Sequence, residues 1–461
     1  MDTVRALRGD GPWFVSIELH TLPWSPDDLV SSGQAPVAPS AYMLRSAIDH
    51  GCRTAVLSFA PSEYLAGFEP LVHRWMTVDT RSVRACLAAI EELDGPIAAV
   101  TSSIDNFVGI ASRVAAHLGL RGTNPRGAAM ARDKSAVRKA LSESGTPNAR
   151  WAAADIDAAL TTSPIGYPCV VKPVDGAGGW DVKLVQDDHE LEELCAAHLG
   201  REYGRQVRPR RRLVFEEHLA GALVSCEGFV DNGRIEIFGY SDRVLGPLPS
   251  FVEVAVRFSP AVLDERLGDY TEECLRSVSY TFGAFHLEMI VSPDRLTLVE
   301  LNARLIGGGL QHAMSAVSSA PASDYCVGRL LGVSAQPPTF SGGATQLQLF
   351  AETSGVLNAV SGIQEAGAVP GCIAVGALPG PGHRVIGPPE SNSDALGFVH
   401  ATGQGREDSW ETALAAAARL DFDMSPCEPP RGSDADSVQR GVPSGGPSVA
   451  RTCRQPSPGW L

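Results

Sequence analysis

Two short apolar stretches near residue 290 contain carboxylates and an amide. The stretch LTLVELNAR (296–304) contains Glu300 and Asn302, and FHLEMIV (285–291) contains Glu288. Both stretches are strand-like, and the turn-forming residues between them predict a β-hairpin. A buried strand face does not normally take such polar side chains unless a partner stabilises them.

The predicted register of this hairpin brings the polar side chains together. A turn centred on Asp294 gives three cross-strand pairs: Glu288 with Glu300, His286 with Asn302, and Ile290 with Leu298. Directly opposite residues have Cβ atoms ~4.5–5.5 Å apart, so the two carboxylates would repel each other unless a cation joined them. Carboxylate and amide oxygens suit Mg²⁺, which also takes phosphate oxygens and water. The alternative is a half-exposed sheet whose charges point into solvent.

A lysine precedes a glycine-rich segment in CVVKPVDGAGGW (169–180). Lys172 follows an apolar run, and Gly176, Gly178 and Gly179 come shortly after it. Backbone N–H groups of such loops can surround phosphates, and the lysine supplies a positive charge. The segment lacks the GK[ST] of a Walker A motif. An ordinary β-hairpin with a glycine turn therefore stays open as the alternative.

Acidic residues also end the strand-like segment LVFEEHL (213–219). These are Glu216 and Glu217, and Glu227 lies in the next strand-like segment. Free backbone groups at a strand end beside acidic side chains could receive a purine and a ribose. A solvated sheet edge is the simpler interpretation of this segment taken alone.

Length and composition limit the class of protein. A chain of 461 residues is too long for one core, so about two to four domains are expected. The net charge of −15 argues against nucleic acid or an anionic membrane as a partner, but not against a nucleotide in a locally basic pocket. The sequence shows no membrane-spanning apolar run and no signal-peptide core. The ten cysteines include no CxxC pair and are interpreted as reduced thiols, which predicts a cytoplasmic protein.

The chain divides into four regions. Residues 1–124 alternate strands and helices, which predicts a parallel α/β domain, without a GxGxxG fingerprint. Residues 125–335 begin with a helix over 127–145 and continue as a largely antiparallel α+β domain. Residues 336–424 form a small α+β module. Residues 425–461 are rich in Pro, Gly, Ser and Arg and are predicted to be disordered.

The order of these features resembles the ATP-grasp superfamily of carboxylate–amine ligases. The resemblance rests on Lys134 in a helix, Lys172 before the glycine loop, the FEEHL segment, and Glu288 followed 12 residues later by the ELN signature. It covers roughly residues 1–421 and is strongest over 127–309. It implies a multidomain α/β and α+β fold, with an N-terminal parallel α/β domain and an ATP-grasp domain whose glycine-loop lid spans about 146–215. The small C-terminal module is similar to that of the biotin-carboxylase-like branch.

The resemblance also implies a role for individual residues, with ATP and two Mg²⁺ ions as cofactors. The phosphates would contact Lys134, Lys172 and the loop of Gly176, Gly178 and Gly179. Adenine would be held by Glu216 and the backbone from Glu217 to Leu219, and ribose by Glu227. The Mg²⁺ ions would be bound by Glu288, Glu300 and Asn302. Arg243 would lie near the transferred phosphate and Arg304 near the acyl group. The substrates would contact Glu253, Gly308 and His312.

The favoured function is an ATP-dependent ligase that forms an amide or peptide bond between small amino-acid-like substrates. The reaction would pass through an acyl phosphate and release ADP and phosphate. Two alternatives stay open: carboxylation of the biotin-carboxylase type, and a non-catalytic ATP-binding module. The partners would be small-molecule carboxylates and amines, with neither nucleic acid nor membrane. A homodimer is compatible with this interpretation.

Overall fold

The computed structural model describes residues 11–18, 30–33, 39–59, 69–157, 159–200, 209–307, 309–377 and 380–426. The tail predicted to be disordered lies outside the described residues, apart from the end of strand β20 (Asp421–Pro426). Within the described part of the chain, no helix combines the length and the apolar character needed to cross a membrane. The cysteines that the structure describes are free thiols.

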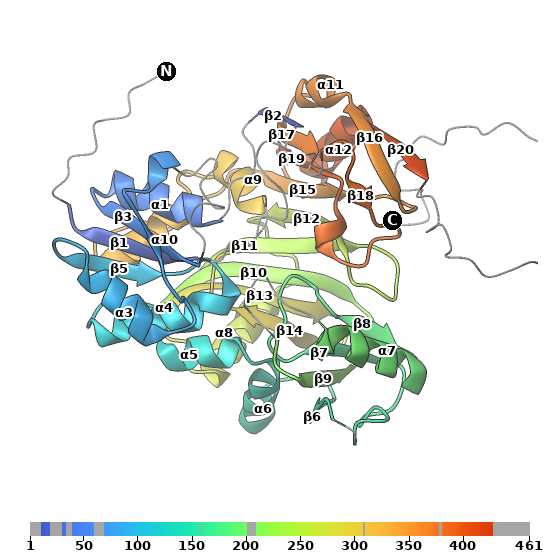
Figure 1. Ribbon diagram of the computed structural model, residues 1–461, viewed down its shortest axis with the longest axis horizontal. Helices are drawn as coiled ribbons and strands as arrows, with labels where there is room; N and C mark the ends of the chain where they lie inside the picture. Colours follow the sequence, from blue (N-terminus) through green and yellow to red (C-terminus); the bar gives the residue numbers. More distant parts are fainter. Residues whose placement is uncertain are drawn as a thin grey trace, which may run out of the picture.

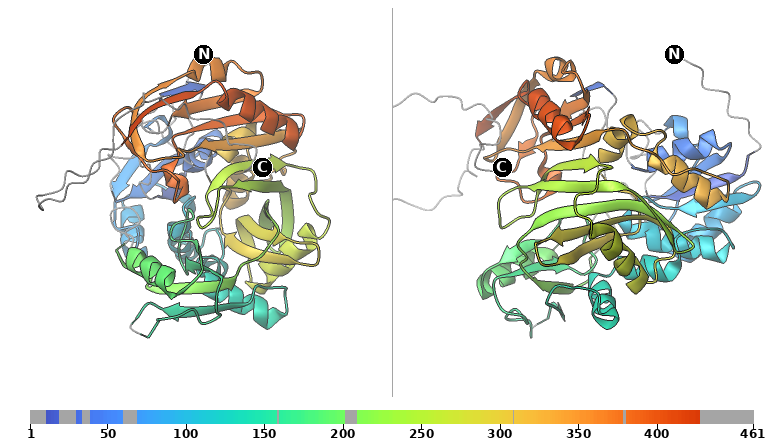
Figure 2. Two further views of the ribbon diagram at one scale, coloured as in Figure 1. Left: turned by 90° about the vertical axis from the view of Figure 1, so that its right-hand side faces the viewer. Right: turned by 180° about the vertical axis from the view of Figure 1, so that it is seen from behind.

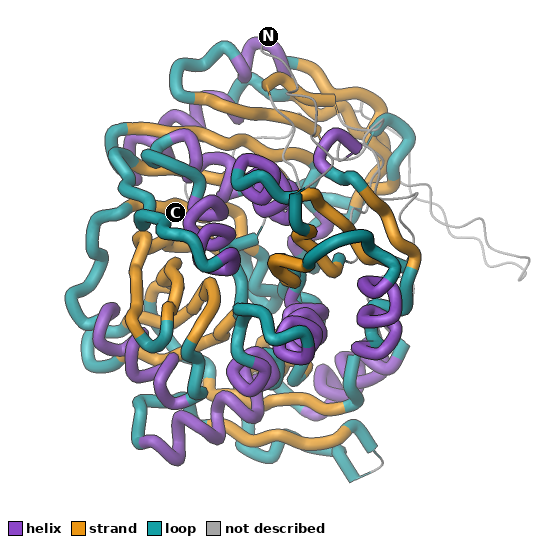
Figure 3. The backbone as a smooth tube through the Cα atoms, turned by 90° about the vertical axis from the view of Figure 1, so that its left-hand side faces the viewer, coloured by secondary structure: helices purple, strands orange, loops and turns teal. Residues whose placement is uncertain are grey.

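The N-terminal region folds into a parallel four-stranded sheet, as expected. Its order is β4-β3-β1-β5, with β1 (Trp13–Ile17), β3 (Arg53–Ser58), β4 (Arg74–Thr77) and β5 (Ile97–Thr101). Alternate residues of the strands face opposite sides. Phe14 and Val56 pack with α1 (Pro39–Asp49) and α10 (Ala322–Leu331), whereas Val15 and Leu57 pack with α3 (Val83–Glu91) and α4 (Asp105–His117). Figure 3, which faces this end of the molecule, shows helices on either side of the strands.

A nine-stranded antiparallel sheet forms the centre of the molecule (Figure 1). Its order is β14-β13-β10-β11-β12-β15-β19-β17-β2. The strands from the predicted ATP-grasp region are β10 (Ala222–Asp231), β11 (Arg234–Leu245), β12 (Glu253–Ser259), β13 (Phe282–Val291) and β14 (Leu296–Asn302). Helix α8 (Leu267–Ser277) contributes Tyr270 and Leu275 to the core on one face of β10 and β13.

The C-terminal module extends this central sheet and also forms a small sheet of its own. Its strands in the sheet are β15 (Gly343–Leu349), β17 (Cys372–Ala377) and β19 (Gly397–Gly403), and the N-terminal strand β2 (Val30–Gly33) pairs with β17. Helices α9 (Leu310–Ala316), α11 (Ile363–Gly367) and α12 (Arg406–Ala417) pack on these strands. Strands β16 (Gly355–Ser361), β18 (Arg384–Val385) and β20 form a separate small sheet.

The predicted lid is a separate four-stranded sheet of order β6-β9-β7-β8. It consists of β6 (Trp151–Asp155), β7 (Cys169–Pro173), β8 (Lys183–Val185) and β9 (Arg212–Glu217), covered by α7 (Asp188–Leu199). Figures 1 and 2 show the C-terminal module above and the lid below the stack of long central strands. The domain boundaries predicted from the sequence stay predictions. The central sheet contains strands from both sides of the boundary predicted at residue 335.

The single helix predicted over 127–145 is wrong, because two helices occupy this segment. Helix α5 (Pro125–Ala131) ends before Asp133, whose side chain accepts a hydrogen bond from the backbone of Ala136 and begins α6 (Lys134–Ser144). An aspartate at this position satisfies free N–H groups of the first turn. Helix α6 ends at Gly145, whose φ of 76° favours glycine. The break places Lys134 at the start of a helix.

Candidate functional site

A cavity of roughly 2200 Å³, measured to its open mouth, lies between the lid, the central strands and the C-terminal module. Most of the predicted site residues line it: Lys134, Lys172, Gly176, Gly178, Gly179, Glu216, Glu217, Leu219, Arg243, Glu253, Glu288, Glu300, Asn302 and Arg304. They come from five stretches of sequence. The fold therefore brings together the three motifs that sequence analysis treated separately.

The hairpin of β13 and β14 has the predicted register at its polar end. Glu288 pairs with Glu300 and His286 pairs with Asn302. The predicted pairing of Ile290 with Leu298 is wrong, because Val299 forms a β-bulge and shifts the remaining register by one residue. A bulge leaves its extra residue outside the ladder.

The bulge gives two cations a backbone acceptor. The carbonyl of Val299 accepts hydrogen bonds from Lys172 Nζ at 3.1 Å and from Arg138 Nη2 at 3.4 Å. Lys172 comes from the lid strand β7 and Arg138 from helix α6. The irregularity in the hairpin therefore helps to join the lid to the central sheet.

Lys134 connects the glycine loop to the hairpin carboxylates. Its Nζ donates to the carbonyl of Gly176 at 2.9 Å and lies 2.7 Å from Glu300 Oε1. Gly178 and Gly179 have φ values of 66° and 73°, which glycine adopts without strain. The loop is thus shaped by glycine and held at one end by a buried cation.

Glu216 is enclosed between two cations. Arg138 donates to its two carboxylate oxygens at 2.7 and 2.9 Å, and Lys172 lies 2.9 Å from Oε2. Burial alone would raise the pKa of Glu216, but Arg138 and Lys172 outweigh burial and lower it to about 2. Burial lowers the pKa of Lys172, against the effect of Glu216. The carboxylate expected to hold adenine is therefore placed to orient Lys172, while the adjacent backbone from Glu217 to Leu219 borders the cavity.

His286 links two carboxylates. Its Nδ1 lies 2.8 Å from Glu227 Oε2 and its Nε2 lies 2.9 Å from Glu288 Oε1. Burial would lower the pKa of His286, but the two glutamates outweigh burial and raise it to about 9, so both ring nitrogens donate at neutral pH. Glu227 is 1% exposed and also accepts from Ser225. The Glu227 side chain is not among those that line the cavity and pairs with His286, and its contact with ribose stays a prediction.

Arg243 extends this network toward the C-terminal module. Its Nε lies 2.6 Å from Glu253 Oε1, and its Nη2 lies 3.4 Å from Glu288 Oε1. Asn392, in the short helix η4 (Asn392–Asp394), donates to Glu253 Oε2 at 3.3 Å and accepts from the Glu253 backbone at 2.8 Å. Sequence reasoning missed Asn392, because nothing in its local sequence marks it as a contact of a residue 139 positions away.

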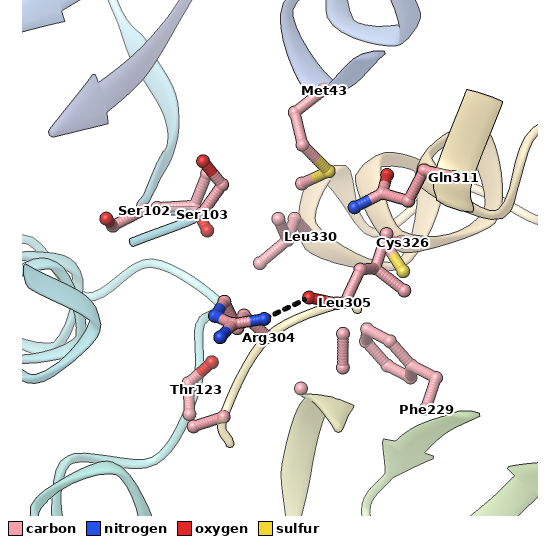
Figure 4. Close-up of a pocket in the computed structure, with 14 residues that line it drawn as sticks. Met43, Ser102, Ser103, Thr123, Phe229, Arg304, Leu305, Gln311, Cys326 and Leu330 are labelled. Atoms are coloured by element: carbon pink, nitrogen blue, oxygen red, sulfur yellow. Dashed lines mark hydrogen bonds between the residues drawn. The ribbon is translucent and has the colours of Figure 1, made fainter. Parts of the chain in front are cut away.

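Arg304 is held by the N-terminal domain. Asp105, at the start of α4, accepts from Arg304 Nε at 2.8 Å and from Nη2 at 2.5 Å, and Nη1 donates to the carbonyl of Leu305. Burial would lower the pKa of Arg304, but Asp105 outweighs it and raises the pKa. Figure 4 shows Arg304 beside a second cavity of roughly 460 Å³, which Ser102, Ser103 and Thr123 also line. Asp105 was not identified from the sequence.

The predicted metal ligands fit a hard cation bound with an additional ligand. Glu288 and Glu300 each use one oxygen, Oε1, in the ion pairs described above. The Asn302 amide is 7% exposed, lines the cavity, and makes no side-chain hydrogen bond with the described residues. In the described ranges, no group of three His, Cys, Asp or Glu side chains could hold a metal alone. Two carboxylates and an amide, completed by phosphate oxygens and water, suit Mg²⁺.

Two predicted substrate contacts, His312 and Gly308, stay predictions. His312, on α9, does not line either cavity. Its Nδ1 lies 2.9 Å from the Tyr42 hydroxyl, and its ring is tilted against that of His400. Gly308 lies outside the described residues, between Gly307 and Gly309.

Comparison with known proteins agrees with this geometry. A family model of the ATP-grasp domain matches residues 165–312, which contain the glycine loop and the hairpin. A model of the L-amino acid ligase C-terminal domain 2 matches residues 347–425. The chain contains an ATP-grasp domain. It is similar to ATP-grasp carboxylate–amine ligases.

Two proteins of known structure share the fold over about 90% of this chain. The L-amino acid ligase from Bacillus licheniformis is 17% identical with a TM-score of 0.71, over 90% of this chain and 99% of that one. The biotin carboxylase domain of the Hydrogenobacter thermophilus 2-oxoglutarate carboxylase is 14% identical with a TM-score of 0.60, over 89% and 90%. An uncharacterized protein of Sinorhizobium fredii, y4rH, is 26% identical over 76% of this chain and 73% of its own length. At these identities the solved structures show the fold.

Proposed function

We propose that this chain joins a carboxylate and an amine, both small and amino-acid-like, at the expense of ATP, through an acyl phosphate. The proposal rests on one observation: a single cavity is lined by two lysines, the glycine loop, the paired carboxylates of the hairpin and an arginine. These residues are Lys134, Lys172, Gly176, Gly178, Gly179, Glu288, Glu300 and Arg304. The match of the C-terminal module to L-amino acid ligases supports amino-acid-like substrates.

The residues that line the cavity would bind the parts of ATP and the metal as follows. Lys134, Lys172 and the glycine loop bind the phosphates, and the backbone from Glu217 to Leu219 borders the adenine. Glu288, Glu300 and Asn302 would hold Mg²⁺, which supplies charge stabilisation to the phosphates when bound. The structure of the Hydrogenobacter thermophilus domain contains MgADP, which supports this cofactor choice. The number of ions, two in our proposal, follows from the family resemblance.

The chemistry needs no protein nucleophile. The substrate carboxylate attacks the γ-phosphate, the bond to ADP breaks, and an acyl phosphate forms. The amine then attacks the acyl carbon and phosphate leaves. Arg304, fixed by Asp105, stabilises the negative charge that develops on the acyl oxygen. Closure of the lid would exclude water from the acyl phosphate. Glu253, beside Arg243, is placed to hold the ammonium group of the second substrate.

The first test is substrate discovery. The protein is incubated with ATP, Mg²⁺ and pools of amino acids, and phosphate release is measured. Release that requires two amino acids supports a ligase. Release that requires bicarbonate instead would favour carboxylation, the reaction type suggested by the bicarbonate-bound Hydrogenobacter thermophilus structure. ATP binding without turnover in any pool would favour a non-catalytic module.

The nucleotide product tests the proposed path. Because the lysines and the hairpin carboxylates surround the phosphates, we expect γ-phosphate transfer, so that ADP accumulates in equal amount to phosphate. Chromatography of the nucleotides after turnover measures this. Hydroxylamine, added in place of the amine, should trap the acyl group as a hydroxamate. AMP and pyrophosphate as the main products would exclude the acyl-phosphate path.

A further inference from the structure

One end of the large cavity is lined by amide side chains of the C-terminal module. Gln346 and Gln348 lie on strand β15, and Asn392 lies on helix η4. Residues two apart on a strand share a face, so both glutamines point to the same side as the cavity they line. None of these three residues belongs to the motifs that resemble the ATP-grasp superfamily.

The two glutamines have hydrogen-bonding capacity that the described residues do not use. Gln348 Oε1 is buried and has no hydrogen-bond partner in the described part of the chain. Gln346 is 8% exposed, and its amide makes no side-chain hydrogen bond with a described residue. Buried polar groups in native proteins are nearly always paired, so an unpaired amide that faces a cavity indicates a ligand.

The charges around the cavity indicate the net charge of the group that binds at the amide end. Every lysine and arginine that lines the cavity is in an ion pair: Lys134 with Glu300, Arg138 and Lys172 with Glu216, Arg243 with Glu253, and Arg304 with Asp105. Arg243 adjoins Asn392 through Glu253, and this glutamate balances its charge. Amides donate and accept hydrogen bonds without net charge. This end is therefore suited to a neutral hydrogen-bonding group.

The adjoining contact of Asn392 and Glu253 sets the orientation of the ligand. Asn392 holds Glu253 through two hydrogen bonds, one to the backbone and one to the carboxylate. An ammonium group at Glu253 would direct the rest of the same molecule toward the module that carries Asn392, Gln346 and Gln348.

We propose that Gln346 and Gln348 form a specificity subsite for a neutral polar side chain, a carboxamide or a hydroxyl, on the amine substrate. This inference rests on the proposed ligase function and names the class of its second substrate. A site built to hydrogen-bond a polar group rejects an apolar analogue of the same shape, because its own amides are then left unpaired.

The test compares amine substrates of matched shape in the full-length protein. The kcat/KM for the amine is measured with asparagine against leucine and with threonine against valine, for the wild-type protein, Gln348→Leu and Gln346→Leu. We expect the wild type to prefer the polar member of each pair. Each variant should lower that preference by about tenfold, the effect of one or two lost hydrogen bonds.

Controls separate a recognition role from a structural one. Gln364→Leu, an exposed glutamine on α11 of the same module, should leave the preference unchanged. Gln348→Leu should keep or raise the melting temperature, because it removes an unpaired buried oxygen. A wild-type preference for leucine and valine, or an unchanged ratio in both variants, would overturn the subsite while leaving a ligase in place. No ADP release with any acid and amine would overturn the ligase and the subsite together.

Discussion

Glu300→Gln is expected to lower kcat by about a thousandfold or more at saturating Mg²⁺ while the fold stays intact. The substitution keeps the size of the side chain and removes the charge that faces Glu288 across the hairpin and that pairs with Lys134. Both a metal ligand and the partner of a phosphate-binding lysine are lost together. Phosphate release in the presence of both substrates measures kcat.

The control for this variant is Glu365→Gln, an exposed glutamate on helix α11. It changes the net charge by the same amount and should keep wild-type activity. Circular dichroism and a melting curve check that Glu300→Gln is folded. Near-normal turnover in a folded Glu300→Gln protein would show that the hairpin is not the metal site.

Glu216→Gln is expected to have the largest effect on stability, about 3–5 kcal/mol, because it leaves buried cations without their countercharge. Arg138 and Lys172 both pair with Glu216, and the Arg138 side chain is 3% exposed and that of Lys172 4%. Urea unfolding, followed by circular dichroism, measures the loss. Activity should also fall, because Lys172 would lose the carboxylate that orients it.

Two further variants test whether the unpaired buried charges cause the loss of stability in Glu216→Gln. Glu236→Gln breaks the pair with Arg234, whose side chain is 81% exposed, and should change stability by at most about 1 kcal/mol. Adding Arg138→Met to Glu216→Gln should recover part of the loss, because one unpaired buried charge is removed. Equal effects of Glu216→Gln and Glu236→Gln would contradict the proposed role of the buried cluster.

Acid pH should remove the same contribution in the wild-type protein. The pKa of Glu216 falls from 4.5 to about 2 on folding, so its ionised form stabilises the folded state fully above pH 4.5. As the pH falls from 4.5 toward 2, this contribution is lost. The difference in unfolding free energy between the wild type and Glu216→Gln should therefore shrink over this interval, and a constant difference would show that ionisation of Glu216 is not responsible.

Local patterns in the sequence were sufficient to predict the parallel N-terminal sheet and the polar end of the hairpin. A turn centred on Asp294 predicted that Glu288 faces Glu300, and the structure confirms this pairing. The bulge at Val299 was not predicted, and its carbonyl accepts hydrogen bonds from cations of α6 and the lid that lie far away in the sequence. The break at Asp133 had a signal, since an aspartate before a lysine can begin a helix, but the apolar periodicity on both sides concealed it.

Long-range partners of the site residues were beyond sequence reasoning. Asp105 and Arg304 are 199 positions apart, and Arg138 and Glu216 are 78 positions apart. A single sequence carries no signal for such pairs. The motif residues were therefore predicted only as ligands of ATP and substrate, whereas several of them form ion pairs with one another in the structure. The same gap explains why the burial of Glu227 beside His286 was not predicted, because it follows from the pairing of β10 with β13.

The position of strand β2 has a consequence for how the protein is made. Residues 30–33 pair with residues 374–377, so this edge of the central sheet cannot form until almost the whole chain has been synthesised. At about 5–20 residues per second, the ribosome needs roughly 20–70 s to make the intervening residues. During that interval residues 30–33 have no strand to pair with. After the C-terminal module has been synthesised, its strand β17 pairs with these early residues and the edge of the sheet is complete. A C-terminal fragment expressed without its first forty residues would therefore expose the edge of β17, and the order of biosynthesis makes the last module the one that closes the sheet.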